Sequence, residues 1–195
     1  MKLYYNRGAC SLADHIVLVE AGIDVDLIHV DLTNRLTEHG DNFAEVNPKG
    51  YVPTLVFDDG AVLTENVAIM DWVSAQAPQL VPPGPLGRQR NLEMLAFLAT
   101  EVHRPFMRSM FSPADAEKDA AKDAIVSRLS LIADEMDADY VFGDTFSAAD
   151  ALLYVMVRWA RDFGLNPPAR LLDFAQRVEA RPGVKEALRR EGLAA

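Results

Sequence analysis

The sequence predicts an α/β domain followed by an all-helical domain, and three observations support this prediction. Strand-like and helix-like segments alternate through the first 77 residues. Residues 78–90 then hold four prolines and two glycines, a density that stops a helix and is typical of a linker. Beyond the linker, apolar residues recur at helical spacing and no strand pattern is present. We therefore expect domains over 1–77 and 91–195, joined by a linker over 78–90.

The beginning of the chain has the pattern of a β-α-β unit. Residues 2–5 and 26–31 have the composition of strands. Between them, residues 11–21 predict a helix with Leu12 and Ile16 on one face. Such a unit has parallel strands and a right-handed crossover.

A hairpin and a second helix follow a poorly defined connector. Residues 54–57 and 61–63 flank an Asp-Asp-Gly turn signal, and a helix is expected from about residue 65 to 76. The hairpin adds an antiparallel pair to the same small sheet. This order of strands and helices is that of a thioredoxin-like domain.

The second half predicts helices only. An amphipathic helix covers 116–136, and 169–190 forms one or two helices broken at Arg181-Pro182-Gly183. Ser147 and Asp150 form a capping-box pattern that sets the start of another helix, and losing either residue should cost roughly 1 kcal/mol or more. The first long helix is indicated by an apolar stripe of Leu92, Leu95, Ala96, Ala99, Val102, Phe106 and Met110.

Charge and hydropathy exclude several classes of protein. The chain of 195 residues has 29 acidic and 19 basic residues, so its formal net charge is −10. This argues against nucleic acid as the main partner, because phosphate binding needs a basic surface. No apolar run is long enough to span a membrane, and Arg7 and Asp14 interrupt any signal peptide. We expect a cytoplasmic protein.

Cys10 is the first candidate for chemistry. As the single cysteine it excludes an internal disulfide and a thiolate zinc site. It precedes a helix whose expected N-cap is Ser11, and the dipole there, together with nearby Arg7, predicts a lowered thiol pKa, which Asp14 opposes. The alternative is a small buried core residue. Ala13 stands where a dithiol motif has its second cysteine, so a reactive Cys10 would need an external small thiol.

Two further motifs lie in the first half. A cis bond before Pro53 would turn the backbone of Val52 outward, where an extended peptide could pair with it; the alternative is a plain proline-rich turn. Glu65 could hold an ammonium group at a helix N-terminus that suits a carboxylate. The alternative there is ordinary capping by Thr64 or Asn66.

His103 lies on or beside the apolar stripe of the first long helix. By default it is a satisfied core histidine, and Pro105 should kink the helix close by. The other three histidines show no metal-ligand spacing with it, so no metal site is expected.

Five stretches in this order resemble the glutathione transferases, and specifically their bacterial beta class. They begin at Gly8, Val46, Leu63, Ala99 and Phe146, and the resemblance covers essentially the whole chain. It implies a thioredoxin-like domain that binds glutathione, an all-helical domain that lines the pocket of a second substrate, and a homodimer.

The resemblance also implies roles for individual residues. Cys10 would contact the glutathione sulfur, by hydrogen bond or as a mixed disulfide, and Val52 before Pro53 would pair with the tripeptide backbone. Glu65 and Asn66 would take the γ-glutamyl end, and Arg35 the glycyl carboxylate. The remaining implied glutathione contacts are Tyr51, Thr100 and Glu101, and the implied catalytic residues are Cys10 and His103. Thr100, Glu101 and His103 would close the site from the helical domain.

Three residues depart from the pattern of the family. Arg35 replaces a common lysine, Tyr51 a more usual glutamine, and Ala96 an asparagine, so one polar contact to glutathione should be missing. In a chain of charge −10, Arg35, Lys49 and two helix N-termini supply the local positive charge that anionic glutathione needs.

The expected activity is conjugation of reduced glutathione to small hydrophobic electrophiles, a detoxification reaction that uses glutathione as co-substrate and no metal. The first alternative is a glutathione-dependent thiol transferase or peroxidase with Cys10 as nucleophile. The second is a binding protein of the same fold without turnover. The predicted electrophile pocket consists of Phe106, Met107, Met110 and Trp159.

Overall fold

The computed structural model describes residues 1–193. Its contacts divide the chain into two compact units, of which the first contains Met1–Pro78 and the segment from Arg181 onward, and the second contains Gln79–Ala180. This division differs at the C-terminal end from the one expected from sequence, where all of 91–195 was assigned to the helical domain. The expected linker also contains a short 3-10 helix, η1 (Pro78–Leu80), and the first turn of α4 (Gly87–Phe97).

The first unit contains a five-stranded sheet in the order β3-β2-β1-β4-β5. β1 pairs in parallel with β2 and antiparallel with β4, with Leu3 opposite both Leu27 and Leu55. The β-α-β unit and the hairpin that the sequence predicts are thereby confirmed, and the fold is thioredoxin-like. The strands are β1 (Lys2–Tyr5), β2 (Asp26–Asp31), β3 (Leu36–Thr37), β4 (Thr54–Val56) and β5 (Val62–Thr64).

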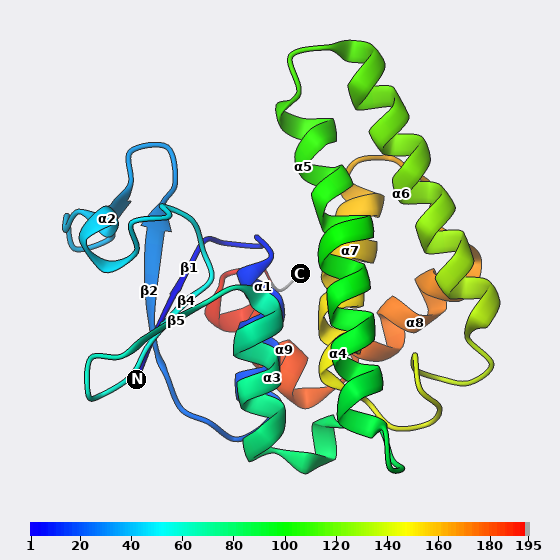
Figure 1. Ribbon diagram of the computed structural model, residues 1–195, viewed down its shortest axis with the longest axis horizontal. Coiled ribbons are helices and arrows are strands. Elements are labelled where there is room, and N and C mark those ends of the chain that lie inside the picture. Colours follow the sequence, from blue (N-terminus) through cyan, green and yellow to red (C-terminus); the bar gives the residue numbers. More distant parts are fainter. Residues whose placement is uncertain (194–195) are drawn as a thin grey trace. The chain divides into compact units, whose positions relative to one another are not determined.

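Helices cover both sides of this sheet (Figure 1). α1 (Ser11–Glu20) and α3 (Asn66–Gln76) pack together on one side, and the short α2 (Phe43–Val46) lies on the other. Phe43 is fully buried and packs in a cluster with Val30 and Val52. This cluster lies near the end of β2 and just before β4, and it contains the candidate site residue Val52.

The last helix, α9 (Pro182–Arg190), belongs to the first unit because it packs on α1. The Arg181 guanidinium donates to both carboxylate oxygens of Glu20, at 3.0 and 2.6 Å. Arg190 donates to the backbone oxygen of Val25 at 2.8 Å. The composition of the segment predicted a helix, but its partner lies about 170 residues away in the chain and is set by tertiary contacts.

The second unit is all-helical, as the sequence predicts. The long first helix is continued through a π-helical segment, η2 (Leu98–His103), which ends two residues before Pro105. The capping box at Ser147 and Asp150 is confirmed, and the helix that it begins, α7 (Ala148–Asp162), is buried along most of its length. The remaining helices of the described chain are α5 (Arg104–Phe111), α6 (Asp115–Glu135) and α8 (Ala169–Glu179). Between residues 1 and 193 no helix is both long and apolar enough to cross a membrane.

Candidate active site

Cys10 lies at the start of α1 and is nearly buried, with 8% of its surface exposed. It is itself the N-cap residue of the helix, a position that the sequence analysis assigned to Ser11. The Ser11 hydroxyl instead donates to the backbone oxygen of Asn6 and accepts its N–H, both at 3.3 Å. The Cys10 thiol donates to the backbone oxygen of Val52, with Sγ 3.6 Å from that oxygen.

Burial and, after it, the carboxyl of Asp14 raise the pKa of the Cys10 thiol, which reaches about 12. The backbone N–H groups of Ser11 and Cys10 and the amide of Asn66 lower the pKa, but by less. The expectation of a lowered pKa is therefore wrong, because loss of hydration of the thiolate outweighs the helix N-terminus. At neutral pH the thiol is protonated and acts as a hydrogen-bond donor.

Asn66 joins the beginnings of α1 and α3. Its side-chain nitrogen donates to the Asp14 carboxylate at 2.6 Å and to the backbone oxygen of Cys10 at 3.0 Å. Asp14 is fully buried, and burial holds its pKa well above the ordinary value. Neither Thr64 nor Asn66 caps α3: its N-cap is Glu65, which makes no side-chain capping bond.

Glu65 brings together the polar side chains of the neighbouring loop. Its Oε1 accepts hydrogen bonds from Lys49 Nζ at 2.6 Å and from the Tyr51 hydroxyl at 2.7 Å. These two bonds hold the pKa of Glu65 below its usual value. The backbone of Glu65 has φ 75°, a strained conformation for a residue with a side chain that is frequent at functional sites. From the sequence, Lys49 is expected only as a source of positive charge.

The bond between Val52 and Pro53 is cis, one of the two alternatives that the sequence left open for this turn. Asn47 holds the loop: its amide donates to the backbone oxygen of Tyr51 at 2.8 Å and to the Thr54 hydroxyl at 2.9 Å. Asn47 is 2% exposed, and its role in the turn was not predicted from the sequence. An asparagine before a proline is a turn signal that could have pointed to it.

Arg35 reaches the same loop from the turn just before β3. Its backbone has φ 56°, and its guanidinium lies against Gly50, where an added Cβ would come within 3.5 Å of it. Arg35 is exposed, and within residues 1–193 its side chain makes no hydrogen bond or ion pair. The structure thus groups Arg35, Lys49, Tyr51 and Glu65 at one edge of the first unit, with Cys10 and Val52 beneath.

The residues predicted in the second unit form an aromatic group. The ring of Trp159 lies 5.5 Å from that of His103 and 5.4 Å from that of Phe106. Burial lowers the pKa of His103, and no described residue bonds its buried Nε2. Phe106 is fully buried and packs against Trp159, whereas Met107 and Met110 are partly exposed.

The side chains of Thr100 and Glu101 are already bonded within the second unit. The Thr100 hydroxyl donates to the backbone oxygen of Ala96 at 3.0 Å, and Glu101 pairs with Arg128 at 3.1 Å. Among the described residues, no group of three His, Cys, Asp or Glu side chains could hold a metal ion.

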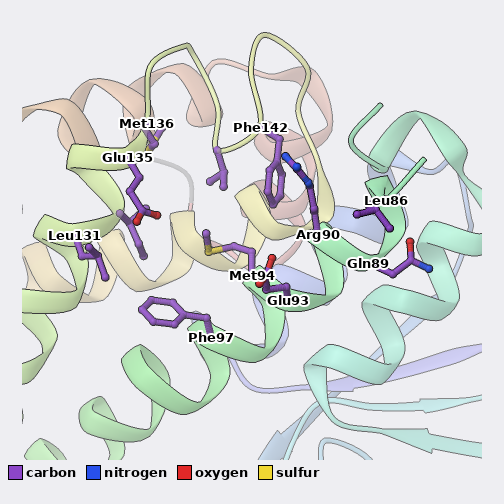
Figure 2. A pocket seen from close by; sticks show the side chains of 12 residues that line it. Leu86, Gln89, Arg90, Glu93, Met94, Phe97, Leu131, Glu135, Met136 and Phe142 are labelled. Atoms are coloured by element: carbon purple, nitrogen blue, oxygen red, sulfur yellow. The ribbon is translucent and has the colours of Figure 1, made fainter. Parts of the chain in front are cut away.

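A pocket of about 780 Å³, which the sequence did not indicate, lies elsewhere in the second unit. Figure 2 shows Met94 and Phe97 of α4 facing it from one side and Leu131 and Glu135 of α6 from another. None of the residues predicted for the site lines it.

Comparisons with known proteins agree with this architecture. Residues 9–76 match the family model of the glutathione S-transferase N-terminal domain, and residues 95–182 match that of the C-terminal domain. Glutathione S-transferase GstA of Escherichia coli O157:H7 is 40% identical over 99% of this chain and all of its own length. A maleylpyruvate isomerase of Ralstonia sp is 31% identical over the whole chain and 98% of its own length.

Solved structures give the same result. A sphingomonad glutathione S-transferase complexed with glutathione and the bacterial beta class glutathione S-transferase of Sphingomonas chungbukensis each match with a TM-score of 0.90. Each is 40% identical, and the match covers all of this chain and all of the other. The protein described here therefore belongs to the glutathione S-transferase family, and within it to the bacterial beta class.

Proposed function

We propose that this transferase conjugates reduced glutathione to small hydrophobic electrophiles, as a cytoplasmic detoxification enzyme. The observation that carries the proposal is the grouping of Cys10, Val52 and Glu65 around one loop, with the Cys10 thiol 3.6 Å from the Val52 carbonyl. A sphingomonad relative of similar fold is complexed with glutathione, which supports the same tripeptide as the ligand of this loop.

Each group of the loop has a matching group on glutathione. The backbone of Val52 would pair with the tripeptide, and Arg35 would bind the glycyl carboxylate. Glu65 would exchange its bond to Lys49 for one to the α-ammonium group, with Asn66 and the N-terminus of α3 near the α-carboxylate. Tyr51, which already donates to Glu65, would keep that carboxylate oriented.

The chemistry follows from the state of the thiol. A protonated Cys10 can donate its S–H to the glutathione sulfur and so stabilise the bound thiolate. The thiolate then attacks the electrophilic carbon: a C–S bond forms, and the leaving group departs with its electron pair. The thiol proton of glutathione is released to solvent when the thiolate forms.

Calorimetry tests the proposal under reducing conditions. Uptake of glutathione, together with turnover of an aryl chloride carrying nitro groups, is the expected result. No uptake at millimolar excess would contradict it. A stable adduct with oxidised glutathione that is lost in Cys10→Ser, with disulfide reduction faster than conjugation, would instead favour a thiol transferase or peroxidase. Uptake without turnover of any electrophile would favour a binding protein.

Isomerisation of an unsaturated dicarboxylic acid is a second candidate, because a maleylpyruvate isomerase is similar along the whole chain. The same preparation tests it, with maleylpyruvate in place of the aryl chloride. Faster turnover of maleylpyruvate than of any electrophile in the panel would favour this candidate.

We assign binding of the electrophile to Phe106 and Trp159 of the aromatic group in the second unit, together with Met107 and Met110. Trp159→Ala removes the ring that packs on His103 and Phe106, so it should change the order in which electrophiles are preferred. The control is Trp72→Ala, the same change at the other tryptophan of the chain, because Trp72 packs on Phe57, outside this aromatic group. An unchanged order in Trp159→Ala would refute the assignment.

We also propose a homodimer that uses the pocket between α4 and α6. Leu86 and Leu131 line it and are 56% and 43% exposed, and Arg90 lines it together with Glu135. A two-fold interface places the same patch on both copies, so opposite charges can meet across the axis. Light scattering should give about twice the chain mass of 21.5 kDa, and Leu131→Glu should reduce it to one chain. Phe111→Glu, outside this pocket, should remain dimeric; a dimeric Leu131→Glu would contradict the proposal.

A further inference from the structure

The end of α9 is bonded to the loop that carries Cys10. Glu191, the first residue after α9, is 1% exposed. Its Oε2 accepts the N–H of Gly8 at 3.0 Å, and its Oε1 lies 3.0 Å from Nδ1 of the fully buried His15. One buried carboxylate therefore joins the loop before α1, the middle of α1 and the end of α9.

The residues after Glu191 pack closely on the same loop. A Cβ on Gly8 would meet the Leu193 side chain at 3.5 Å, and one on Gly192 would meet the Arg7 guanidinium at 3.2 Å. Both glycines also have positive φ, 65° and 67°, which side chains rarely adopt. The C-terminal segment thus leaves the loop little room for another backbone path.

Glu191 is not needed simply to dock α9. At the opposite end of the same two helices, Glu20 forms a bidentate ion pair with Arg181, and the Glu20 side chain is 10% exposed. Besides its contact with His15 on α1, Glu191 has a bond that Glu20 lacks, to the N–H of Gly8, two residues before Cys10. A charge-assisted bond to a backbone N–H is strong, and its loss would leave that N–H without its carboxylate acceptor.

We infer that Glu191 is a positioning residue for glutathione: it fixes the Gly8–Cys10 loop so that the thiol of Cys10 faces the sulfur of the tripeptide. This inference rests on the proposed function. Movement of the Gly8 amide would shift both the thiol and the first N–H groups of α1, and so weaken their contacts with bound glutathione.

A pair of matched variants tests this role. Glu191→Ala and Glu20→Ala each remove one carboxylate that joins α1 to the end or the start of the α9 segment, and both should lower the melting temperature. Only Glu191→Ala should weaken glutathione binding, by about tenfold. Its KM for glutathione should rise in proportion, and kcat at saturation should change less. Glu191→Gln keeps an oxygen for the Gly8 N–H and should recover most of the binding.

Two outcomes would overturn the inference: wild-type affinity in Glu191→Ala, or an equal loss of affinity in Glu20→Ala. If Glu191→Ala does not fold, the pair Glu191→Asp and Glu20→Asp makes the same comparison, because the shorter side chain draws the carboxylate back from Gly8. If the wild-type protein takes up no glutathione, the proposed function fails instead. The positioning role is then decided by hydrogen exchange at the Gly8 amide, which should accelerate with the change at Glu191 and not with that at Glu20.

Discussion

Near pH 8, the thiol of Cys10 in the ligand-free protein should react with iodoacetamide about a thousandfold more slowly than an exposed cysteine. The reason is its pKa, which burial raises from 9.0 to about 12, so that the reactive thiolate is scarce. The rate, followed by mass spectrometry, should still be rising at pH 10, where an exposed thiol has already levelled off. Cys10→Ser, which removes the only cysteine, gives the background.

Asp14→Asn tests the cause of this shift. The negative charge of Asp14 raises the pKa of Cys10, so its removal should lower that pKa and accelerate alkylation several-fold near pH 9. A rate that levels off below pH 8 in the wild-type protein would contradict the buried, protonated thiol. It would favour the thiol transferase alternative.

The same shift makes folding sensitive to alkaline pH. The folded pKa of Cys10 is raised, so the fold favours the protonated thiol, and the unfolded chain holds fewer protons once pH exceeds its lower pKa. The stabilisation is complete below about pH 9 and is lost as pH rises towards about 12. Urea midpoints should fall over this window in the wild-type protein, and fall less in Cys10→Ser.

Asp150→Ala should destabilise the second unit by about 3 kcal/mol, through loss of a helix cap together with unpaired buried N–H groups. Asp150 is fully buried, and its carboxylate accepts the N–H of Ser147 at 2.8 Å, the hydroxyl of Ser147 at 2.6 Å and the N–H of Val141 at 2.8 Å. This exceeds the value expected from the capping box alone, because Asp150 also holds the chain before α7. Urea unfolding followed by circular dichroism measures the change.

Two comparisons make the result specific. Asp150→Asn keeps one oxygen and should lose less stability than the alanine variant. Asp162→Ala, at the exposed end of α7, should be neutral or slightly stabilising, since an acid is unfavourable at a helix C-terminus. A change of less than about 0.5 kcal/mol in Asp150→Ala would contradict the role given to its three bonds.

The parts of the fold that the sequence predicted are those with a local signal. In the first unit, strand-like segments lie on either side of a segment with helical spacing of apolar residues. The helices of the second unit carry continuous apolar stripes. β3 and α2 were missed because elements of two and four residues are too short to show any period. The π-helical segment before Pro105 is a change of hydrogen bonding that apolar spacing does not report.

The site divides in the same way. Cys10, Pro53 and Glu65 were found because each stands in a recognisable motif next to a helix or strand. Asn47 and Lys49 were not singled out as site residues, although the structure shows Asn47 holding the turn and Lys49 bonded to Glu65. Such roles depend on which side chains come into contact when the loop that contains Asn47 and Lys49 packs near β5, and the sequence of the loop does not show this.

By itself, the sequence determined the two-part architecture, the family and the identity of the residues at the cis-proline loop, because these depend on local periodicity and on short motifs. The tertiary structure alone decided that α9 returns to α1, that Glu191 reaches the Gly8 amide, and that the Cys10 thiol is protonated. These features depend on burial and on contacts between residues far apart in the chain. Desolvation of a charge depends on everything packed around it, and no single stretch of residues encodes that.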